Sequence, residues 1–251
     1  MQFRFKALSL HLLVSCMALT LILGGLYLGW YRWPGWYLAD VTQVVAVITG
    51  VDLVVGPLLT FVIASPRKPR RALTRDIAVI VAVQLFALGY GTLSLWNGRP
   101  LYYAFSEDVL QLVQAYDIDA DDLQRARRQH LALVPHWYSL PRWIWAPLPA
   151  ESKERDKIVA AAISGGADVI GMPEYYKPWA SGLAGLRAQL KRIDDVKYFS
   201  GNDKALFKQR MQAAGFATDQ MNAMALTGRG RPLLAVFDPA SATTVAIFRV
   251  N

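Results

Sequence analysis

The sequence predicts a membrane protein, with three N-terminal transmembrane α-helices followed by an α+β extracytoplasmic domain that contains a small antiparallel sheet. Two observations carry this prediction. The 251 residues are 54% hydrophobic and include eight tryptophans, which is more apolar than a typical soluble domain, and nearly all of the excess precedes Pro100. Residues 99–251 carry 16 acidic and 19 basic side chains and have the size of one ordinary domain. We therefore expect a three-span region over residues 1–98 and a separate domain over residues 99–251.

Three apolar runs, at residues 7–30, 41–64 and 77–96, approach the ~20 residues that a helix needs to cross a bilayer. Residues 1–98 hold eight Lys or Arg against three acids, and five of those eight lie in the segment SPRKPRRALTR. Since positive loops resist translocation, we expect the N-terminus and a basic loop at residues 65–76 in the cytoplasm. Three crossings then place residues 99–251 outside the cytoplasm. The net charge of +8 is thus a topology signal, and we expect no binding of nucleic acid.

Aromatic side chains favour the same orientation, because their amphipathic rings prefer the headgroup level of a bilayer. Those expected at the outer ends of the spans are Trp30, Tyr31, Trp33, Trp36, Tyr37 and Trp96. The single cysteine, Cys16, lies in the first span, so the outer domain must be held together by its core. A cleaved signal peptide and a lipidated Cys16 in the segment LVSC are the alternatives. The length of the apolar run, and its continuation beyond Cys16, favour an uncleaved and unmodified span.

The second span contains an acidic residue, Asp52, near its middle. A carboxylate at the centre of a bilayer costs ~2.5 to 3.5 kcal/mol on insertion scales, so it is expected to face other protein, to be protonated, or both. Asp52 lies 12 residues from Ala64 at the inner end of its span, and Leu88 has the same depth on the third span. The best polar neighbours are therefore Tyr90 and, about one turn toward the cytoplasm, Gln84.

Other residues near Asp52 bear on how the spans pack. Small residues let two helices approach closely, and the candidates are Gly50, Gly56, Gly89 and Gly91. Pro57 lacks the amide that would bond the carbonyl of Leu53, which leaves a free acceptor. His11 is expected nearer the inner face than Asp52. Three roles for Asp52 remain open: a hydrogen bond that clips two spans together, a docking site for another membrane helix, and a proton or ion relay.

The stretch GVDLVVGPLLT, the Pro-rich basic loop, the span IAVIVAVQLFALGYGTLSLW and the following NGRPLYYAF together resemble type IV pilin accessory proteins of the TfpX/TfpZ kind. These are encoded beside major pilin genes in bacteria. The specific part of the resemblance covers residues 48–106, and the segment MPEYYKPW shows a weaker similarity. It marks Asp52, Gly56 and Pro57 as motif positions and supplies no catalytic residues.

The resemblance implies a multi-pass protein of the bacterial inner membrane that helps a cognate pilin to be assembled or displayed. The partners it implies are a cognate type IV major pilin, other inner-membrane pilus assembly proteins and the lipid bilayer. The distal half of the outer domain departs most from the family pattern and is a candidate determinant of pilin preference.

The outer domain should begin with two strands around a Ser106-Glu107-Asp108 turn, in a segment rich in aromatic and branched residues. It should end with a hairpin over residues 231–251, turning at Asp238-Pro239, that could pair with the first hairpin. Between them, four helices are expected at residues 119–132, 153–164, 183–193 and 203–214. Strands at both ends and helices between them predict the α+β class.

Two segments of this domain are rich in aromatic residues. HWYSLPRWIWAPLP, residues 136–149, contains three prolines, so it cannot form a regular helix. The second segment is MPEYYKPW, residues 172–179. The aromatic residues proposed as partner-binding candidates are Trp137, Trp143, Trp145, Tyr175, Tyr176 and Trp179. Such segments fold onto the core, lie on the membrane surface, or anchor a partner, and the sequence leaves the three alternatives open.

Motifs for catalysis are weak, and we predict a non-enzymatic protein without metal or cofactor. His130 and His136 are six residues apart, which is not a metal-ligand spacing on a helix. The segment GGADVIG lacks the order of a dinucleotide-binding loop, and DIDADD lacks the glycine and glutamate of an EF-hand. The alternative function is an envelope ligand sensor or a membrane-bound enzyme with a periplasmic domain, which would need a deep polar pocket. A transporter fragment is disfavoured by three spans with few charges.

Overall fold

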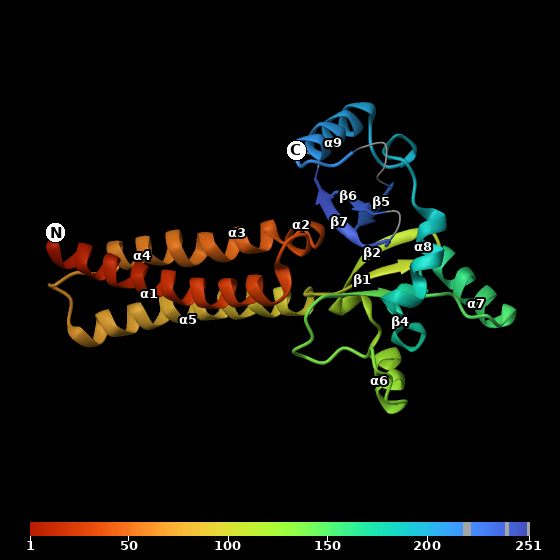
Figure 1. Cartoon of the computed structure of the whole chain (residues 1–251). Coiled ribbons are helices and arrows are strands. Elements are labelled where there is room, and N and C mark those ends of the chain that lie inside the picture. Colours follow the sequence, from red (N-terminus) through yellow and green to blue (C-terminus); the bar gives the residue numbers. More distant parts are fainter. Residues whose placement is uncertain (218–221, 239–240, 250–251) are drawn as a thin grey trace. The chain divides into compact units, whose positions relative to one another are not determined.

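The computed structural model describes residues 1–217, 222–238 and 241–249, and the chain packs as two compact units (Figure 1). The first unit contains Met1–Arg32 and Asp40–Arg99, and the second contains Trp33–Ala39 and Pro100–Asn251. The division near residue 99 follows the change in composition along the sequence. The seven residues Trp33–Ala39 are the exception, since they lie between the first two long helices but pack with the second unit.

The first unit is built from three continuous helices, Gln2–Tyr31, Thr42–Ile63 and Arg70–Asn97, each long and apolar enough to cross a membrane. The first consists of α1 (Gln2–Leu26) and the π turn η1 (Tyr27–Tyr31). The second consists of α3 (Thr42–Gly50), the π turn η2 (Val51–Val55) and α4 (Gly56–Ile63). The third is α5 (Arg70–Asn97). Helices α1 and α5 both pack against the second helix and contact each other little.

The expected basic loop at residues 65–76 is shorter in the structure, because α5 begins at Arg70. Pro69 precedes its first residue and has the extended backbone of a helix N-cap, a conformation that ends the loop. The residues that follow, Arg70 to Arg75, include several good helix formers. Lys68 in the remaining loop forms an ion pair of 2.9 Å with Asp76 on α5.

Aromatic residues gather where the first and third helices end. The Tyr31 hydroxyl donates to the carbonyl of Leu95 at 2.6 Å, and the rings of Trp30 and Trp96 meet edge to face at 5.1 Å. The Arg99 guanidinium lies 4.4 Å from the centre of the Trp96 ring. Burial at this position lowers the pKa of Arg99 from its ordinary value. Trp30, Tyr31 and Trp96 thus lie together at one end of the unit.

The second unit contains one seven-stranded mixed sheet with the order β4-β3-β1-β2-β5-β6-β7. The strands are β1 (Pro100–Ser106), β2 (Val109–Gln114), β3 (Arg142–Trp145), β4 (Lys177–Pro178), β5 (Asn222–Thr227), β6 (Leu233–Phe237) and β7 (Thr244–Phe248). The pairs β1–β3 and β2–β5 are parallel, and the other neighbours are antiparallel. The first hairpin is confirmed, with its turn at Glu107 and Asp108. The expected small antiparallel sheet was wrong in both size and type.

Three strands outside the predicted hairpins, β3, β4 and β5, account for the larger sheet. Strand β3 lies in the Trp-rich segment, where the prolines flank the strand Arg142–Trp145 and so leave its hydrogen bonds intact. Strand β5 stands between β2 and β6, so the terminal hairpin does not pair directly with the first one. That terminal hairpin, β6–β7, is antiparallel as expected, but Pro239 in its turn and residues 250–251 lie outside the described residues.

Helices surround this sheet near the positions that the sequence indicates (Figure 1). They are α6 (Ala120–Arg128), α7 (Ser152–Ile163), α8 (Leu183–Gln189) and α9 (Gly201–Ala213). One core joins β1 and β3 to α7 through residues such as Tyr102, Ile144 and Ile158. A second core joins β5 and β6 to α9, around the fully buried Phe207. Between the two cores, β2 and β5 pair over only two positions, Leu110 with Leu226 and Gln111 with Thr227.

The segment Trp33–Ala39, which includes the short helix α2 (Gly35–Leu38), packs on the turn between β5 and β6. Leu38 is fully buried, and its carbonyl accepts a hydrogen bond of 2.8 Å from the amide of Gly230. A Cβ atom at Gly230 would lie 2.1 Å from the carbonyl oxygen of Tyr37, and one at Gly228 would lie 2.6 Å from that of Leu38. Two glycines therefore allow the two backbones to approach each other.

Candidate functional site

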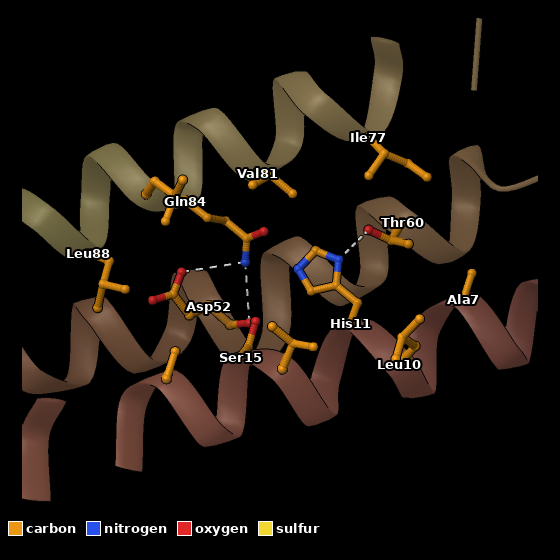
Figure 2. Close-up of a pocket in the computed structure, with 13 residues that line it drawn as sticks. Ala7, Leu10, His11, Ser15, Asp52, Thr60, Ile77, Val81, Gln84 and Leu88 are labelled. Atoms are coloured by element: carbon orange, nitrogen blue, oxygen red, sulfur yellow. Dashed lines mark hydrogen bonds between the residues drawn. The ribbon is translucent and has the colours of Figure 1, made fainter. Parts of the chain in front are cut away.

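The candidate site is a groove in the first unit, between α1 and α5 with the second helix as its floor (Figure 2). The groove encloses a cavity of about 330 Å³. Ala, Leu, Val and Ile side chains of α1 and α5 form most of its lining. The polar residues that line it are His11, Ser15, Asp52, Thr60 and Gln84. Residues from three separate helices thus enclose one largely apolar hollow with a polar floor.

Asp52 is the acidic residue of this floor, and its side chain is only 4% exposed. The Gln84 side-chain amide donates to Asp52 Oδ1 at 3.4 Å and to the Asp52 carbonyl oxygen, also at 3.4 Å. The other carboxylate oxygen, Oδ2, has no hydrogen-bond partner within the described parts of the chain. Gln84 therefore holds one side of the carboxyl group and leaves the other side unpaired.

The local backbone explains why Gln84 can reach the Asp52 carbonyl. In the π turn η2, the Gly56 amide bonds to the carbonyl of Val51 instead of that of Asp52. Pro57, the next residue along, has no amide hydrogen. The Asp52 carbonyl therefore has neither the i+4 amide of an α-helix nor the i+5 amide of a π turn as a donor, and the side-chain amide of Gln84 donates to it instead. We had predicted a free acceptor at Leu53, whereas the carbonyl that Gln84 reaches is one residue earlier.

Two of the four candidate glycines in this unit lie at close helix contacts. A Cβ atom at Gly56 would lie 2.0 Å from Gln84 Nε2, and one at Gly91 would lie 2.3 Å from Ile48 Cδ1. At Gly50 and Gly89, by contrast, an added Cβ atom would meet nothing within 4 Å. Gly56 therefore provides the space in which the Gln84 side chain approaches Asp52.

His11 and Thr60 form a second polar pair, with Nδ1 and Oγ1 2.6 Å apart. Both residues line the groove that contains Asp52. His11 bonds to Thr60, which is eight residues closer to the Ala64 end of the second helix than Asp52, as the expected depth of His11 implies. A helical signal could have found this pair. Asp52, Gly56 and Thr60 are spaced i, i+4, i+8, and His11 and Ser15 are spaced i, i+4, so each set lies on one helix face.

Tyr90, the other expected neighbour of Asp52, lies outside this cluster. Its side chain is 71% exposed, and it does not line the groove. The reason is the phase of α5, since Gln84, Leu88 and Gly91 are spaced i, i+4, i+7 on one face. Tyr90 is rotated from that face by about a third of a turn. Matching depth alone was therefore a poor guide to contact.

In the second unit, most of the six aromatic candidates pack within the fold. Trp143 is half-buried, with its ring 4.9 Å from Tyr103 and 5.1 Å from Trp179. Trp145 is half-buried beside Gly182, where a Cβ atom would lie 2.5 Å from the indole, and the Lys177 ammonium lies 5.4 Å from its ring. These three tryptophans therefore extend the packing of β3 and β4.

The two tyrosine candidates also have partners inside the unit. Tyr176 is buried, and its hydroxyl donates to the carbonyl of Ile170 at 2.5 Å. The Tyr175 hydroxyl donates to Glu154 Oε1 at 2.6 Å. Burial, followed by the effect of neighbouring carboxylates, raises the pKa of Tyr175 above its ordinary value. Of the six candidates, Trp137 is the exposed one, at 69%, with Tyr138 beside it at 58%.

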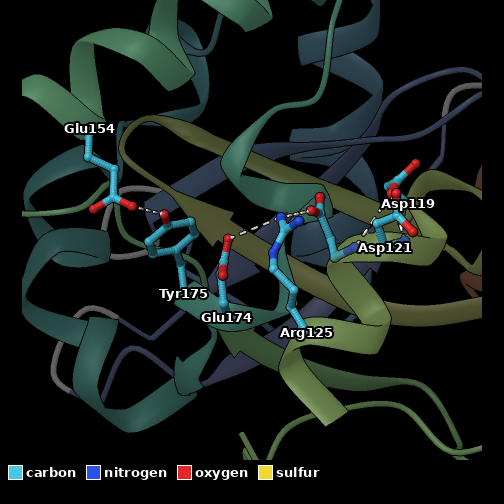
Figure 3. Close-up of polar contacts among 7 residues, drawn as sticks. Asp119, Asp121, Arg125, Glu154, Glu174 and Tyr175 are labelled. Carbon is cyan, nitrogen blue, oxygen red and sulfur yellow. Dashed lines mark hydrogen bonds and ion pairs between the residues drawn. The ribbon is translucent and has the colours of Figure 1, made fainter. Parts of the chain in front are cut away.

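A polar network surrounds Tyr175 (Figure 3). Arg125 on α6 bonds to Asp122 and lies 3.8 Å from Glu174. Asp119 caps the same helix, accepting from the amide of Asp121 at 2.8 Å. The network ties α6 and α7 to the turn Pro173–Tyr175, so it has a structural role. Within the described residues, no cluster of three His, Cys, Asp or Glu side chains could hold a metal ion.

A second hollow, of about 200 Å³, lies where β2 and β5 diverge. Its charged and phenolic residues are Asp108, Lys191, Lys197 and Tyr198. Lys191 reaches into this gap through a two-bond bridge with Ala223 on β5, at 3.1 and 2.7 Å. The hollow is small and results from the short parallel pairing of β2 and β5, and its charged residues come from separate segments of the chain.

Fold and groove together define a class of protein: three helices long and apolar enough to cross a membrane, open along one side, joined to an α+β unit. The chain is 27% identical over 194 residues to the fimbrial assembly protein of serogroup I from Dichelobacter nodosus, which is 76% of this chain and 73% of that relative. It is 30% identical over 124 residues to the fimbrial assembly protein of serogroups C1 and C2 from the same organism, which is 49% of this chain and 95% of that relative.

The chain therefore belongs to the family of fimbrial assembly proteins. No model of a known protein family matches it, and no solved structure matches it. The 194 aligned residues exceed the 152 residues from Pro100 onward as well as the 99 before them, so the similarity includes parts of both units. A role in the assembly of fimbriae, or pili, follows from this membership.

Proposed function

We propose that the chain is a non-enzymatic, multi-pass accessory factor of the bacterial inner membrane, of the TfpX/TfpZ type. In this proposal it binds a cognate type IV major pilin and assists its assembly or display. The observation that carries the proposal is the similarity to fimbrial assembly proteins over parts of both units. Before assembly, a type IV pilin has one apolar helix in the inner membrane and its head on the outer side. A factor that acts on both parts needs an apolar helix bundle and a folded domain, and this chain has both.

The packing of Trp33–Ala39 supports the topology in this proposal. This segment joins the first two apolar helices, and it packs with residues from Pro100 onward in one unit. Both must therefore lie on the same side of a membrane, as an arrangement with three crossings requires. The basic residues at the opposite ends of the helices, including Lys6 and Lys68, favour the cytoplasm for those ends. The second unit is then periplasmic.

The test is recovery of the pilin with the full chain. An affinity-tagged chain, extracted in mild detergent from the bacterium that encodes it, should retain the cognate major pilin. An unrelated inner-membrane protein with the same tag is the control. Deletion of the gene should reduce surface pili, and a plasmid copy should restore them. Absence of pilin from the purified chain, together with unchanged surface pili in the deletion strain, would overturn the proposal.

A further inference from the structure

We propose that the groove between α1 and α5 seats an apolar helix of the pilin partner, and that a hydrogen-bond donor on that helix bonds to Asp52 Oδ2. This inference rests on the proposed function and assigns the site at which it operates. Three observations carry it: the unpaired carboxylate oxygen, the dimensions of the groove, and the chemistry of its lining (Figure 2).

The unpaired oxygen is the first observation. Asp52 is 4% exposed, and a buried polar atom without a hydrogen bond is costly, the more so in a medium without water. Gln84 bonds to Oδ1 and to the backbone of the same residue, so it fixes the orientation of the carboxyl group. If Asp52 served only to hold the second and third helices together, its contact with Gln84 would be sufficient. The structure leaves Oδ2 as an acceptor, and a donor from outside the chain completes it.

The dimensions of the groove suit a helix. Its walls run from Ala7 to Ala18 on α1 and from Ile77 to Leu88 on α5. Eleven residues of helix rise about 16 Å, or three turns. A cavity of about 330 Å³ holds a few side chains, not a whole helix. It therefore fits one ridge of side chains on a helix that lies along the groove.

The chemistry of the lining distinguishes this occupant from a lipid. A single acyl chain would match the apolar walls but has no donor for Asp52 at mid-groove. A transmembrane helix satisfies its own backbone and presents side chains, and polar side chains pair across helices in bilayers. A second copy of this chain is the remaining occupant, and the experiment below separates it from the pilin.

The experiment places a photo-crosslinking amino acid in the groove of the full chain. Val81 lines the groove, whereas Val83 lies on the same helix, is 60% exposed and points away from the groove. In cells that express the cognate pilin, a benzoylphenylalanine at position 81 should crosslink to the pilin, and one at position 83 should not. Mass spectrometry identifies the crosslinked species. A lipid adduct, a crosslink to a second copy, or equal pilin crosslinking at both positions would overturn the inference.

A second pair of variants tests the role of Oδ2. Asp52→Asn keeps the shape of the side chain and one acceptor for Gln84, but it replaces the second acceptor with a donor. We expect crosslinking from position 81 to fall about tenfold, the effect of losing one buried hydrogen bond, while the thermal stability of the chain is unchanged. Asp76→Asn makes the same change at a carboxylate that pairs with Lys68 and does not line the groove, so this variant should crosslink normally.

Negative results in the pilin-recovery and crosslinking experiments would refute different parts of the proposal. Recovery of pilin with the tagged chain, without a groove-specific crosslink, would refute the groove as its seat and leave the proposed function standing. Equal crosslinking by Asp52→Asn and the unmodified chain would refute the bond to Oδ2. Failure to recover pilin at all would refute the inference, and unchanged surface pili in the deletion strain in addition would refute the proposed function.

Discussion

Pro57, together with the π turn before it, determines which backbone carbonyl of the second helix lacks a helical hydrogen bond. Because η2 shifts the Gly56 amide to Val51, the missing amide of Pro57 leaves the Asp52 carbonyl as the free acceptor. The residue that supplies the acidic side chain therefore also supplies a free backbone oxygen, and one amide of Gln84 serves both. Three features of the sequence motif, Asp52, Gly56 and Pro57, thus contribute to a single interaction.

Gly56 should be the sensitive glycine of this motif. An alanine favours a helix over glycine by about 1 kcal/mol, and at Gly50, where an added Cβ meets nothing within 4 Å, that gain should appear. At Gly56 the Cβ would lie 2.0 Å from Gln84 Nε2. Gly56→Ala should therefore displace the Gln84 amide and break its bonds to Asp52, at a cost of about 1 to 3 kcal/mol for the buried polar groups left unpaired. Thermal unfolding in detergent measures both. Equal melting temperatures for Gly50→Ala and Gly56→Ala would contradict the packing described.

Trp143 and Trp137 form a matched pair in the second unit. Trp143 packs between Tyr103 and Trp179, so Trp143→Ala should destabilise the unit by about 3 kcal/mol, the lower end of the range for large aromatic truncations, since the residue is half-buried. Trp137 is 69% exposed, so Trp137→Ala should change the free energy of unfolding by less than about 0.5 kcal/mol. Chemical denaturation of the full chain measures both. A destabilised Trp137→Ala variant would show that this loop is part of the core.

At the scale of elements, the turn between β5 and β6 contributes to more than the hairpin. Its glycines admit the backbone of residues 37 and 38, and the Gly230 amide bonds to the Leu38 carbonyl. The segment Trp33–Ala39 thereby becomes part of the second unit, although it ends 61 residues before β1 begins.

Gly230→Ala should release this segment, because its Cβ would lie 2.1 Å from the backbone oxygen of Tyr37, which a side-chain rotation cannot relieve. We expect faster proteolysis near residues 33–39 and a loss of about 1 to 3 kcal/mol in stability. Gly201→Ala, at a position where a Cβ meets nothing within 4 Å, is the control. Similar cleavage rates in the two variants would mean that the segment is not held by this turn.

The elements also show which parts of the fold could be predicted from the sequence. The three long helices and the two hairpins have strong local signals: apolar length for the helices, and branched and aromatic runs around turn residues for the strands. Strand β5 has no such alternation, since Asn222–Thr227 reads NAMALT, and its pairing with β2 and β6 is decided by tertiary packing. Strand β3 was obscured by the prolines on either side.

The candidate site around Asp52 was also predictable only in part. Gln84 was predicted from its depth on the third span, because depth follows from counting residues. Tyr90 was predicted by the same count and lies on another face, because depth says nothing of rotation about the helix axis. The π turn that frees the Asp52 carbonyl has no marker in the sequence beyond Pro57. Contacts across helices therefore depend on helix rotation and local backbone geometry, which residue counting does not give.

At the scale of the whole molecule, the orientation in a membrane is the property on which the proposed function depends. A reporter fused after Lys68 should behave as cytoplasmic, and one fused after Asn251 as periplasmic, since positive charges retain the loop between α4 and α5 inside. Alkaline phosphatase and green fluorescent protein fusions, measured at both positions, check this. Phosphatase activity at Lys68 would reverse the orientation and remove the pilin head from reach of the second unit.

The packing of Trp33–Ala39 on Gly228 and Gly230 has a consequence for how this gene can recombine. A crossover near codon 99 would import a foreign sequence from residue 100 onward without the seven-residue segment 33–39 that packs with it. Such a hybrid would combine the native segment Trp33–Ala39 with a foreign turn between β5 and β6 that did not evolve to pack against it. Successful exchange between strains requires two crossovers, or compensating changes in one short stretch near the start of the gene. Natural variants whose residues 100–251 diverge should therefore show correlated divergence at residues 33–39.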